Sequence, residues 1–157
     1  MGLKVGKTRK GKGTKIMLVT DGDGTPLAVH LDSASPAEVK LLETTLAKIS
    51  VGKAGIAGAP RRKPERLIAD RAYDSNGLRA RLAGRGIQPI IPARRTSLAA
   101  THQDGRPLRR YARRWKIERT FAWLLNFRRI TVRWERLDHI YGAFVHLACA
   151  FIVLRRL

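Results

Sequence analysis

Two apolar segments, residues 15–20 and 26–31, flank the turn-forming sequence Asp-Gly-Asp-Gly at 21–24. An Asp-Gly pair readily adopts the positive φ angles that tight hairpin turns require. The pattern therefore predicts an antiparallel hairpin, in which Asp21 and Asp23 serve the turn rather than any chemistry.

Helical and strand-like patterns alternate after the hairpin. Ser35 is placed to cap a helix whose start is marked by Pro36 and Glu38, and apolar residues recur at helical spacing as far as Ile49. Residues 65–70 then predict a short buried strand that ends in an aspartate.

The second half of the chain continues this alternation. A helix capped near Ser75 leads to a short strand at 87–92, whose prolines favour an edge position. A long basic helix at 108–127, a connection, and a last helix at 138–154 follow. This order predicts an α/β fold with a mixed sheet flanked by helices.

The chain carries 32 Lys and Arg residues against 12 Asp and Glu, a formal net charge of +20. Such an excess repels itself in a compact state unless a polyanion neutralises it. DNA is the partner we expect, because each neutralised phosphate releases counterions; an anionic membrane surface is the alternative. Residues 1–14, rich in Gly and Lys, predict a flexible basic loop that leads into the fold.

Several classes of protein do not fit the sequence. The single Cys149 excludes a disulfide framework and a cysteine zinc site. The most apolar segment, residues 140–154, is shorter than the roughly 20 residues that a membrane-spanning helix needs. No secretory signal is evident, so we expect a cytoplasmic protein with no membrane partner.

Two carboxylates stand out in this cationic chain. Asp70 closes the strand predicted at 65–70, and the active groups of open α/β sheets lie beyond such strand ends. Glu118 lies within the predicted basic helix, on one face with Tyr111 and Arg114. Two carboxylates brought together can hold a divalent metal ion against a phosphodiester, although an Arg–Glu pair within one helix is often only structural.

The spacing of these residues resembles that of the DDE transposases of bacterial insertion sequences. One group of these enzymes carries its glutamate in a Y-x2-R-x3-E-x6-K signature, which Tyr111, Arg114 and Glu118 match. Residues 70–75 are similar to the motif of the family's second aspartate. The signature lysine is replaced by Leu125, which departs from the pattern.

The resemblance implies an RNase H-like fold and two bound divalent ions, Mg²⁺ or Mn²⁺. It also implies DNA cleavage at the ends of an element, followed by attack of the freed 3′-hydroxyl on target DNA. Asp70 and Glu118 would be catalytic metal ligands, and Tyr111 a supporting residue or a packing aromatic. The residues implied in DNA binding are Arg114, Asn126, Arg128, Arg129 and Lys15.

A third ligand, the family's first aspartate, is expected on a strand before the basic lead, and Asp21 does not replace it. The sequence therefore predicts a single partial catalytic domain over 1–157 that lacks the first, central strand and is inactive alone. A non-catalytic DNA-binding fragment that regulates transposition in mixed oligomers with full-length enzyme is one alternative. An unrelated basic nucleic-acid-binding module is another. Trp134, in a stretch without helical pattern, is the tryptophan best placed to stack on a base.

Overall fold

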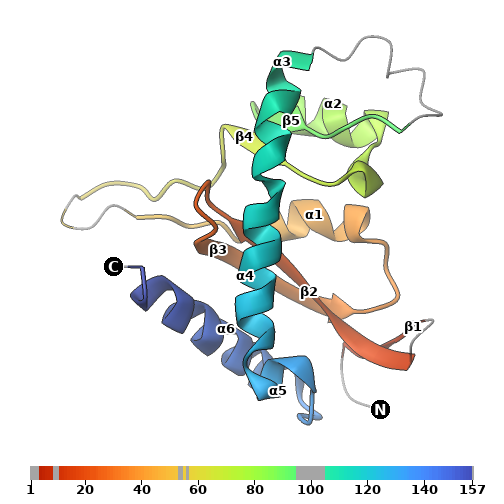
Figure 1. The fold of residues 1–157 in the computed structure, drawn as a ribbon, viewed down its shortest axis with the longest axis vertical. Helices are drawn as coiled ribbons and strands as arrows, with labels where there is room; N and C mark the ends of the chain where they lie inside the picture. Colours follow the sequence, from red (N-terminus) through yellow and green to blue (C-terminus); the bar gives the residue numbers. More distant parts are fainter. Residues whose placement is uncertain (1–3, 9–10, 53–54, 56, 95–104, 157) are drawn as a thin grey trace. The chain divides into compact units, whose positions relative to one another are not determined.

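A computed structural model describes residues 4–8, 11–52, 55, 57–94 and 105–156 (Figure 1). The chain packs as two compact units, one formed by Met1–Arg62 with Lys116–Leu157 and the other by Lys63–Trp115. The assignment of 1–157 to one partial catalytic domain stays a prediction.

The first unit contains a three-stranded antiparallel sheet in the order β1-β2-β3. Its strands are β1 (Gly6–Thr8), β2 (Gly11–Thr20) and β3 (Pro26–Ser33). Met17 pairs with His30, and the register shifts between Val19 and Thr20, just before the turn. The predicted hairpin is confirmed.

Strand β1 and the start of β2 lie in the lead for which the sequence predicts a loop. For these residues the expectation is wrong, because they pair with each other, Gly6 opposite Gly13. A Cβ at Gly6 would lie 2.5 Å from Ser35 Oγ, so the glycine permits the chain at 34–35 to pack against β1. Glycine here serves close approach rather than disorder.

Helix α1 (Glu38–Leu46) has Ala37 as its N-cap, without a side-chain cap hydrogen bond. The predicted cap by Ser35 is therefore wrong, since Ser35 lies before the cap position and packs at Gly6. The helix also ends before the predicted Ile49. Its buried face carries Leu41, Leu42, Thr45 and Leu46.

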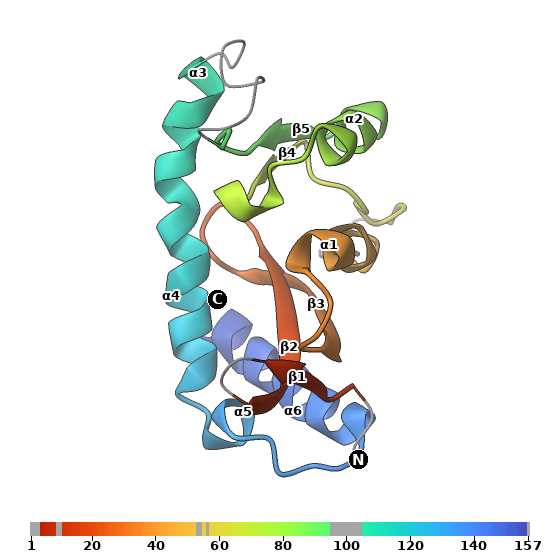
Figure 2. The ribbon, with the colours of Figure 1, turned by 90° about the vertical axis from the view of Figure 1, so that its right-hand side faces the viewer.

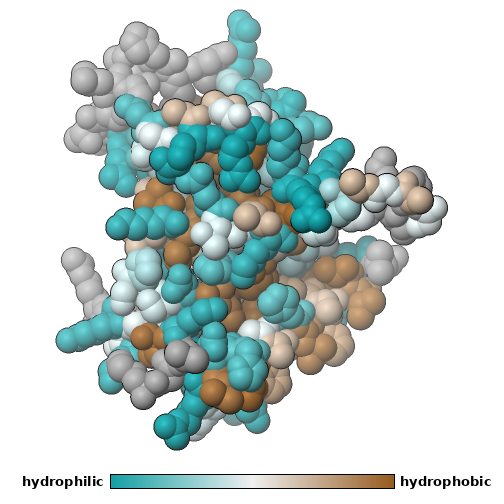
Figure 3. All heavy atoms as spheres, turned by 180° about the vertical axis from the view of Figure 1, so that it is seen from behind, coloured by the Kyte–Doolittle hydropathy of each residue, from teal (hydrophilic) through white to brown (hydrophobic). Residues whose placement is uncertain are grey.

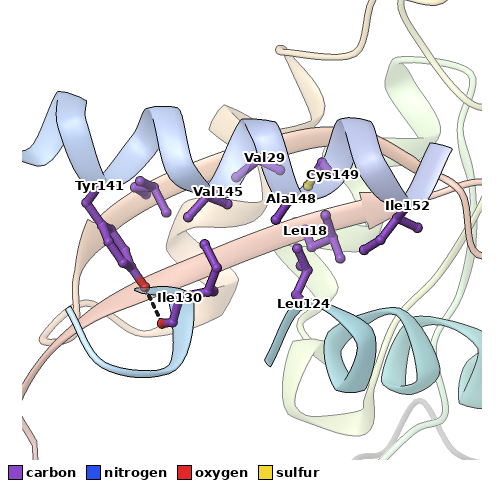
Figure 4. Packing of buried hydrophobic residues seen from close by; sticks show 10 residues of the cluster. Leu18, Val29, Leu124, Ile130, Tyr141, Val145, Ala148, Cys149 and Ile152 are labelled. Atoms are coloured by element: carbon purple, nitrogen blue, oxygen red, sulfur yellow. Dashed lines mark hydrogen bonds between the residues drawn. The ribbon is translucent and has the colours of Figure 1, made fainter. Parts of the chain in front are cut away.

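The core of the first unit lies between the sheet and three helices of the C-terminal segment: α4 (Trp115–Leu125), α5 (Arg128–Thr131) and α6 (Asp138–Leu154). Figure 4 shows Leu18 and Val29 from the sheet packed with Leu124 of α4 and Val145 of α6. In the same cluster, Tyr141 Oη donates a 2.8 Å hydrogen bond to the carbonyl of Ile130.

One sequence prediction for these helices is confirmed and one is wrong. Helix α6 has the predicted bounds, and Cys149 is buried in the core, where burial raises the pKa of its thiol to about 11. The basic helix predicted over 108–127 is instead α3 (Gly105–Leu108), the 3-10 helix η3 (Arg109–Arg114) and α4. A run of arginines with little apolar surface to bury does not hold one continuous amphipathic helix.

The second unit contains the parallel pair β4 (Arg66–Ile68) and β5 (Gln88–Ile90), which lie side by side in Figure 2. Helix α2 (Asn76–Gly84) connects them, after the short 3-10 helix η1 (Arg71–Tyr73). The predicted cap of α2 is confirmed, because Ser75 Oγ accepts a 3.4 Å hydrogen bond from the Leu78 N–H. The buried residues are Leu67, Ala69, Leu78, Leu82, Ile87, Ile90 and Ile91.

The α/β class is confirmed, but the described strands form two separate sheets rather than one mixed sheet. The antiparallel strands lie in one sheet and the parallel strands in the other, and no described strand belongs to both. None of the helices in the described part of the chain combines the length and hydrophobicity needed to cross a membrane.

The exposed face of α6 is apolar. Leu147, Phe151 and Leu154 are each about half exposed or more, at 53%, 46% and 63%. Figure 3, a view from behind, shows brown hydrophobic residues within a largely hydrophilic surface.

Candidate active site

Asp70 lies two residues beyond the end of β4 and caps the short helix η1. Its Oδ1 accepts a hydrogen bond of 2.5 Å from the Arg71 N–H. About half of the side chain, 52%, remains exposed. A carboxylate at a strand end, fixed by a backbone donor and open to solvent, is positioned to contact a ligand.

Tyr111 and Arg114 of η3 converge on Asp70. Tyr111 Oη lies 3.5 Å from Asp70 Oδ1, and Arg114 Nη1 lies 3.9 Å from Asp70 Oδ2. Residues three apart are eclipsed in a 3-10 helix, so both side chains share one face, and the Arg114 guanidinium lies 5.7 Å from the centre of the Tyr111 ring. Residues of the signature and of the second-aspartate motif, which are far apart in sequence, therefore meet in space.

Asp74 anchors the turn that carries Asp70. Its side chain is only 4% exposed, and its Oδ1 accepts hydrogen bonds of 3.1 and 2.8 Å from Nε and Nη2 of Arg79. Its Oδ2 accepts a 2.7 Å hydrogen bond from the Arg94 N–H. Burial alone would raise the pKa of Asp74, but the Arg94 N–H and the Arg79 guanidinium outweigh burial and lower it.

Two arginines extend this anchor to the neighbouring backbone. Arg79 Nη2 donates to the carbonyl of Ile91 at 2.6 Å, just beyond β5. The Arg94 side chain donates to the carbonyls of Arg71 and Ala72, at 3.4 and 3.0 Å. The segment from Asp70 to Asp74 is thus tied to the chain that follows β5.

Sequence reasoning missed Asp74, Arg79 and Arg94 as a set. The sequence places Asp74 only within residues 70–75, the segment similar to the motif of the family's second aspartate. Its five-residue spacing from Arg79 is not one of the i, i+3 or i, i+4 spacings that identify a pair on a helix.

Glu118 is exposed on α4, in the first unit, whereas Asp70 belongs to the second. The approach of the two carboxylates to a shared metal ion stays a prediction. Glu118 is flanked on α4 by residues that hold the hairpin turn. Lys116 Nζ binds the Gly22 carbonyl and Asp23 Oδ1 at 2.6 and 2.9 Å, and Arg119 Nη2 binds the Asp23 carbonyl at 2.8 Å.

The same turn makes its closest backbone approach to α4 at Gly24. Thr120, which is fully buried, donates from Oγ1 to the Gly24 carbonyl at 2.7 Å. A Cβ on Gly24 would lie 3.0 Å from Thr120 Oγ1 and 3.1 Å from the Lys116 carbonyl, and φ is +87°. Glycine is therefore required at this position both by space and by backbone conformation.

We expect Gly24→Ala to lower the free energy of unfolding by about 2 kcal/mol or more, because strained φ and overpacking each cost about 1–3 kcal/mol. Urea unfolding of the full chain would measure the effect. Gly22→Ala is the matched control, since a Cβ there meets nothing within 4 Å. Equal losses of unfolding free energy in Gly24→Ala and Gly22→Ala would contradict the requirement for glycine at position 24.

The remaining predicted DNA-binding residues lie in the first unit. Asn126, Arg128 and Arg129 are exposed around the start of α5, and Arg129 Nη1 also pairs with Glu135 Oε1 at 2.8 Å. Lys15 Nζ donates to the Pro36 carbonyl at 2.5 Å, so its ammonium is already engaged. Leu125, at the signature lysine position, is 52% exposed. The roles of these residues on DNA stay predictions.

Comparison with known proteins decides the family. The family model described as "Transposase DDE domain" matches residues 2–153. The chain belongs to the DDE transposase family. The resemblance stated from the signature residues is thereby confirmed.

Two curated relatives agree with this assignment. A protein of Burkholderia cepacia, described as a candidate transposase for insertion sequence element IS402, is 42% identical over 140 residues. The match covers 89% of this chain and 62% of that protein. One from Brucella ovis, described as a candidate transposase for insertion sequence element IS6501, is 31% identical over 145 residues, 90% of this chain and 98% of the relative. No solved structure matches the chain.

DDE transposases generally use divalent metal ions, and the donors at Asp70 fit such an ion in type. Carboxylate oxygens are the ligands that hard divalent cations prefer, and the Asp70 carboxylate is half exposed. Within the described residues, no three His, Cys, Asp or Glu side chains form a group able to hold a metal ion.

Proposed function

We propose that this chain acts in DNA transposition, through metal-dependent cleavage and transfer of DNA strands, with Asp70 and Glu118 as catalytic carboxylates. The observation that carries this proposal is the convergence of Tyr111 and Arg114 on Asp70. Asp70 belongs to the second-aspartate motif and the other two residues to the signature, so their contact supports a shared site for the two motifs.

Each residue of the site has a role that follows from its chemistry. Asp70 and Glu118 supply oxygen ligands, and the bound divalent ions, Mg²⁺ or Mn²⁺, would activate the attacking oxygen and stabilise the leaving one. Arg114, a planar donor beside Asp70, binds a phosphate oxygen of the scissile strand and keeps it near the carboxylate. Tyr111 holds the orientation of Asp70 and Arg114 through its hydroxyl and its ring.

We also propose that the two sheets belong to an RNase H-like fold. An antiparallel hairpin followed by a parallel β-α-β connection supports this proposal. DNA is the proposed partner because the chain carries a formal net charge of +20. Association with a second transposase chain is also part of the proposal.

The decisive experiment adds a segment to the N-terminal side of this chain. The segment ends in an Asp-Gly pair, which supplies the family's first aspartate. We expect the joined protein to nick supercoiled plasmid DNA in Mg²⁺ and not in EDTA. The unextended chain is the control, and we expect it to bind DNA without nicking it.

The outcomes separate the alternatives. Binding without nicking by the extended protein would favour a non-catalytic DNA-binding regulator. Binding that does not respond to Mg²⁺, together with Asp70 and Glu118 far apart in a solved structure, would favour an unrelated nucleic-acid-binding module.

A further inference from the structure

Trp134 is the most exposed large hydrophobic side chain among the described residues, at 75%. It lies in the loop 132–137 between α5 and α6, in the first unit. Val132 and Leu137, at the two ends of this loop, are also exposed, at 52% and 47%. We name residues 132–137 the tryptophan loop.

Arg133 fixes the tryptophan loop from the inner side. Its Nε donates to the Glu135 carbonyl at 2.8 Å and its Nη2 to the Arg136 carbonyl at 3.2 Å, so the chain closes around its guanidinium. Its Nη1 binds Thr14 Oγ1 of β2, and the guanidinium lies 5.2 Å from the centre of the Tyr141 ring. The residue before Trp134 is therefore tied to both the sheet and α6.

Glu135 fixes the loop on the other side of Trp134. Its side chain is only 6% exposed, and its Oε1 accepts a 2.8 Å hydrogen bond from Arg129. Both neighbours of Trp134 thus face the protein, while the indole between them faces solvent. A large ring held outward on an ordered loop loses little conformational entropy when it binds a partner.

The charges around the loop favour a polyanion. Two acidic residues of this region are paired within the unit, Glu135 with Arg129 and Asp138 with Lys4 at 3.2 Å. Arg128 and Arg136 are exposed beside them. Cationic side chains around an exposed aromatic ring are the elements of a surface that binds single-stranded nucleic acid, with phosphates on the cations and a base on the ring.

We propose that Trp134 is a stacking platform for an unpaired DNA base, held by Arg133 and Glu135. This proposal rests on the proposed function, since it takes DNA as the ligand. It goes beyond that function by assigning a site for a base outside the helix, of the kind that DNA opening at a cleavage point would expose. Base stacking carries no preference for sequence, because every base has a π-face.

The test uses the full chain and two DNA probes, one an intact duplex and one with a single unpaired 2-aminopurine. We expect wild-type protein to quench the fluorescence of the unpaired 2-aminopurine. We expect Trp134→Ala to abolish the quenching and to weaken binding of the second probe about tenfold, the loss typical of one stacked base. Binding of the intact duplex stays within twofold, and Trp134→Phe keeps most of the quenching.

Leu154→Ala is the matched control, because Leu154 is 63% exposed but cannot stack on a base. If Trp134→Ala weakened the binding of both probes equally, or of neither, the stacking proposal would be overturned. The proposal that the chain binds DNA would stand. A change of oligomeric state in gel filtration, without a change in quenching, would assign Trp134 to a protein interface instead. If the wild type bound neither probe, the proposed function and this inference would both fail.

Discussion

Asp70→Asn in the protein extended by an Asp-Gly segment is expected to lower Mg²⁺-dependent nicking by about a thousandfold or more. A metal ligand is worth several kcal/mol of transition-state stabilisation, and each 1.36 kcal/mol is about tenfold in rate. Folding is expected to be unchanged, because asparagine keeps an oxygen that accepts the Arg71 N–H and caps η1 about as well as aspartate. Plasmid nicking and thermal unfolding would be measured on the same preparations.

Glu118→Gln is expected to have an effect of similar size. Asp21→Asn provides the control, since Asp21 accepts hydrogen bonds from the Asp23 and Thr25 N–H groups within the turn, which asparagine also accepts. Full activity of Asp21→Asn beside inactive Asp70→Asn would support the assignment of the carboxylates. Loss of activity in the Asp21 variant alone would contradict it.

Asp74→Ala is expected to lower the stability of the second unit by about 3–5 kcal/mol, the cost of removing one partner of a buried ion pair. Arg79 would keep its charge without the carboxylate, and the Arg94 N–H would lose its acceptor. Amide hydrogen exchange of residues 63–94 would localise the loss. Glu65→Gln, at an exposed position before β4, is the control, and we expect it to change little.

The lowered pKa of Asp74 determines how its contribution to the stability of the second unit depends on pH. A carboxylate with a lower pKa in the folded state stabilises it above the ordinary pKa of 3.8, and the stabilisation is lost as pH falls through the folded-state pKa. We therefore expect Asp74→Asn to be less sensitive than wild type to acid below about pH 4. If the stability of wild type and of Asp74→Asn fell equally as the pH was lowered, the proposed anchoring role of Asp74 would be contradicted.

Much of the fold could be predicted because local signals and tertiary packing agree. The hairpin follows from Asp-Gly in the turn, the α2 cap from Ser75, and α6 from a long apolar segment that packs against β3. In each case the local signal and the apolar residues that the element buries favour the same conformation.

The rest could not be predicted because distant contacts decide it. Ser35 looks like a helix cap, but packing against Gly6 places it before the cap position. Asp74 gains its anchoring role from Arg94, twenty residues later. The 3-10 geometry of η3 brings Tyr111 and Arg114 to Asp70, and no periodicity in the sequence distinguishes it from a regular α-helix.

The hydrogen bonds between α4 and the hairpin turn limit how this protein can be engineered. Exposed loop tips are ordinarily the first choice for epitope tags, fluorescent insertions and circular permutation. The tip at Asp23 does not qualify, because Arg156 near the C-terminus also donates to its carbonyl at 2.6 Å. Labels belong elsewhere, since lengthening this tip would release the helix that carries Glu118.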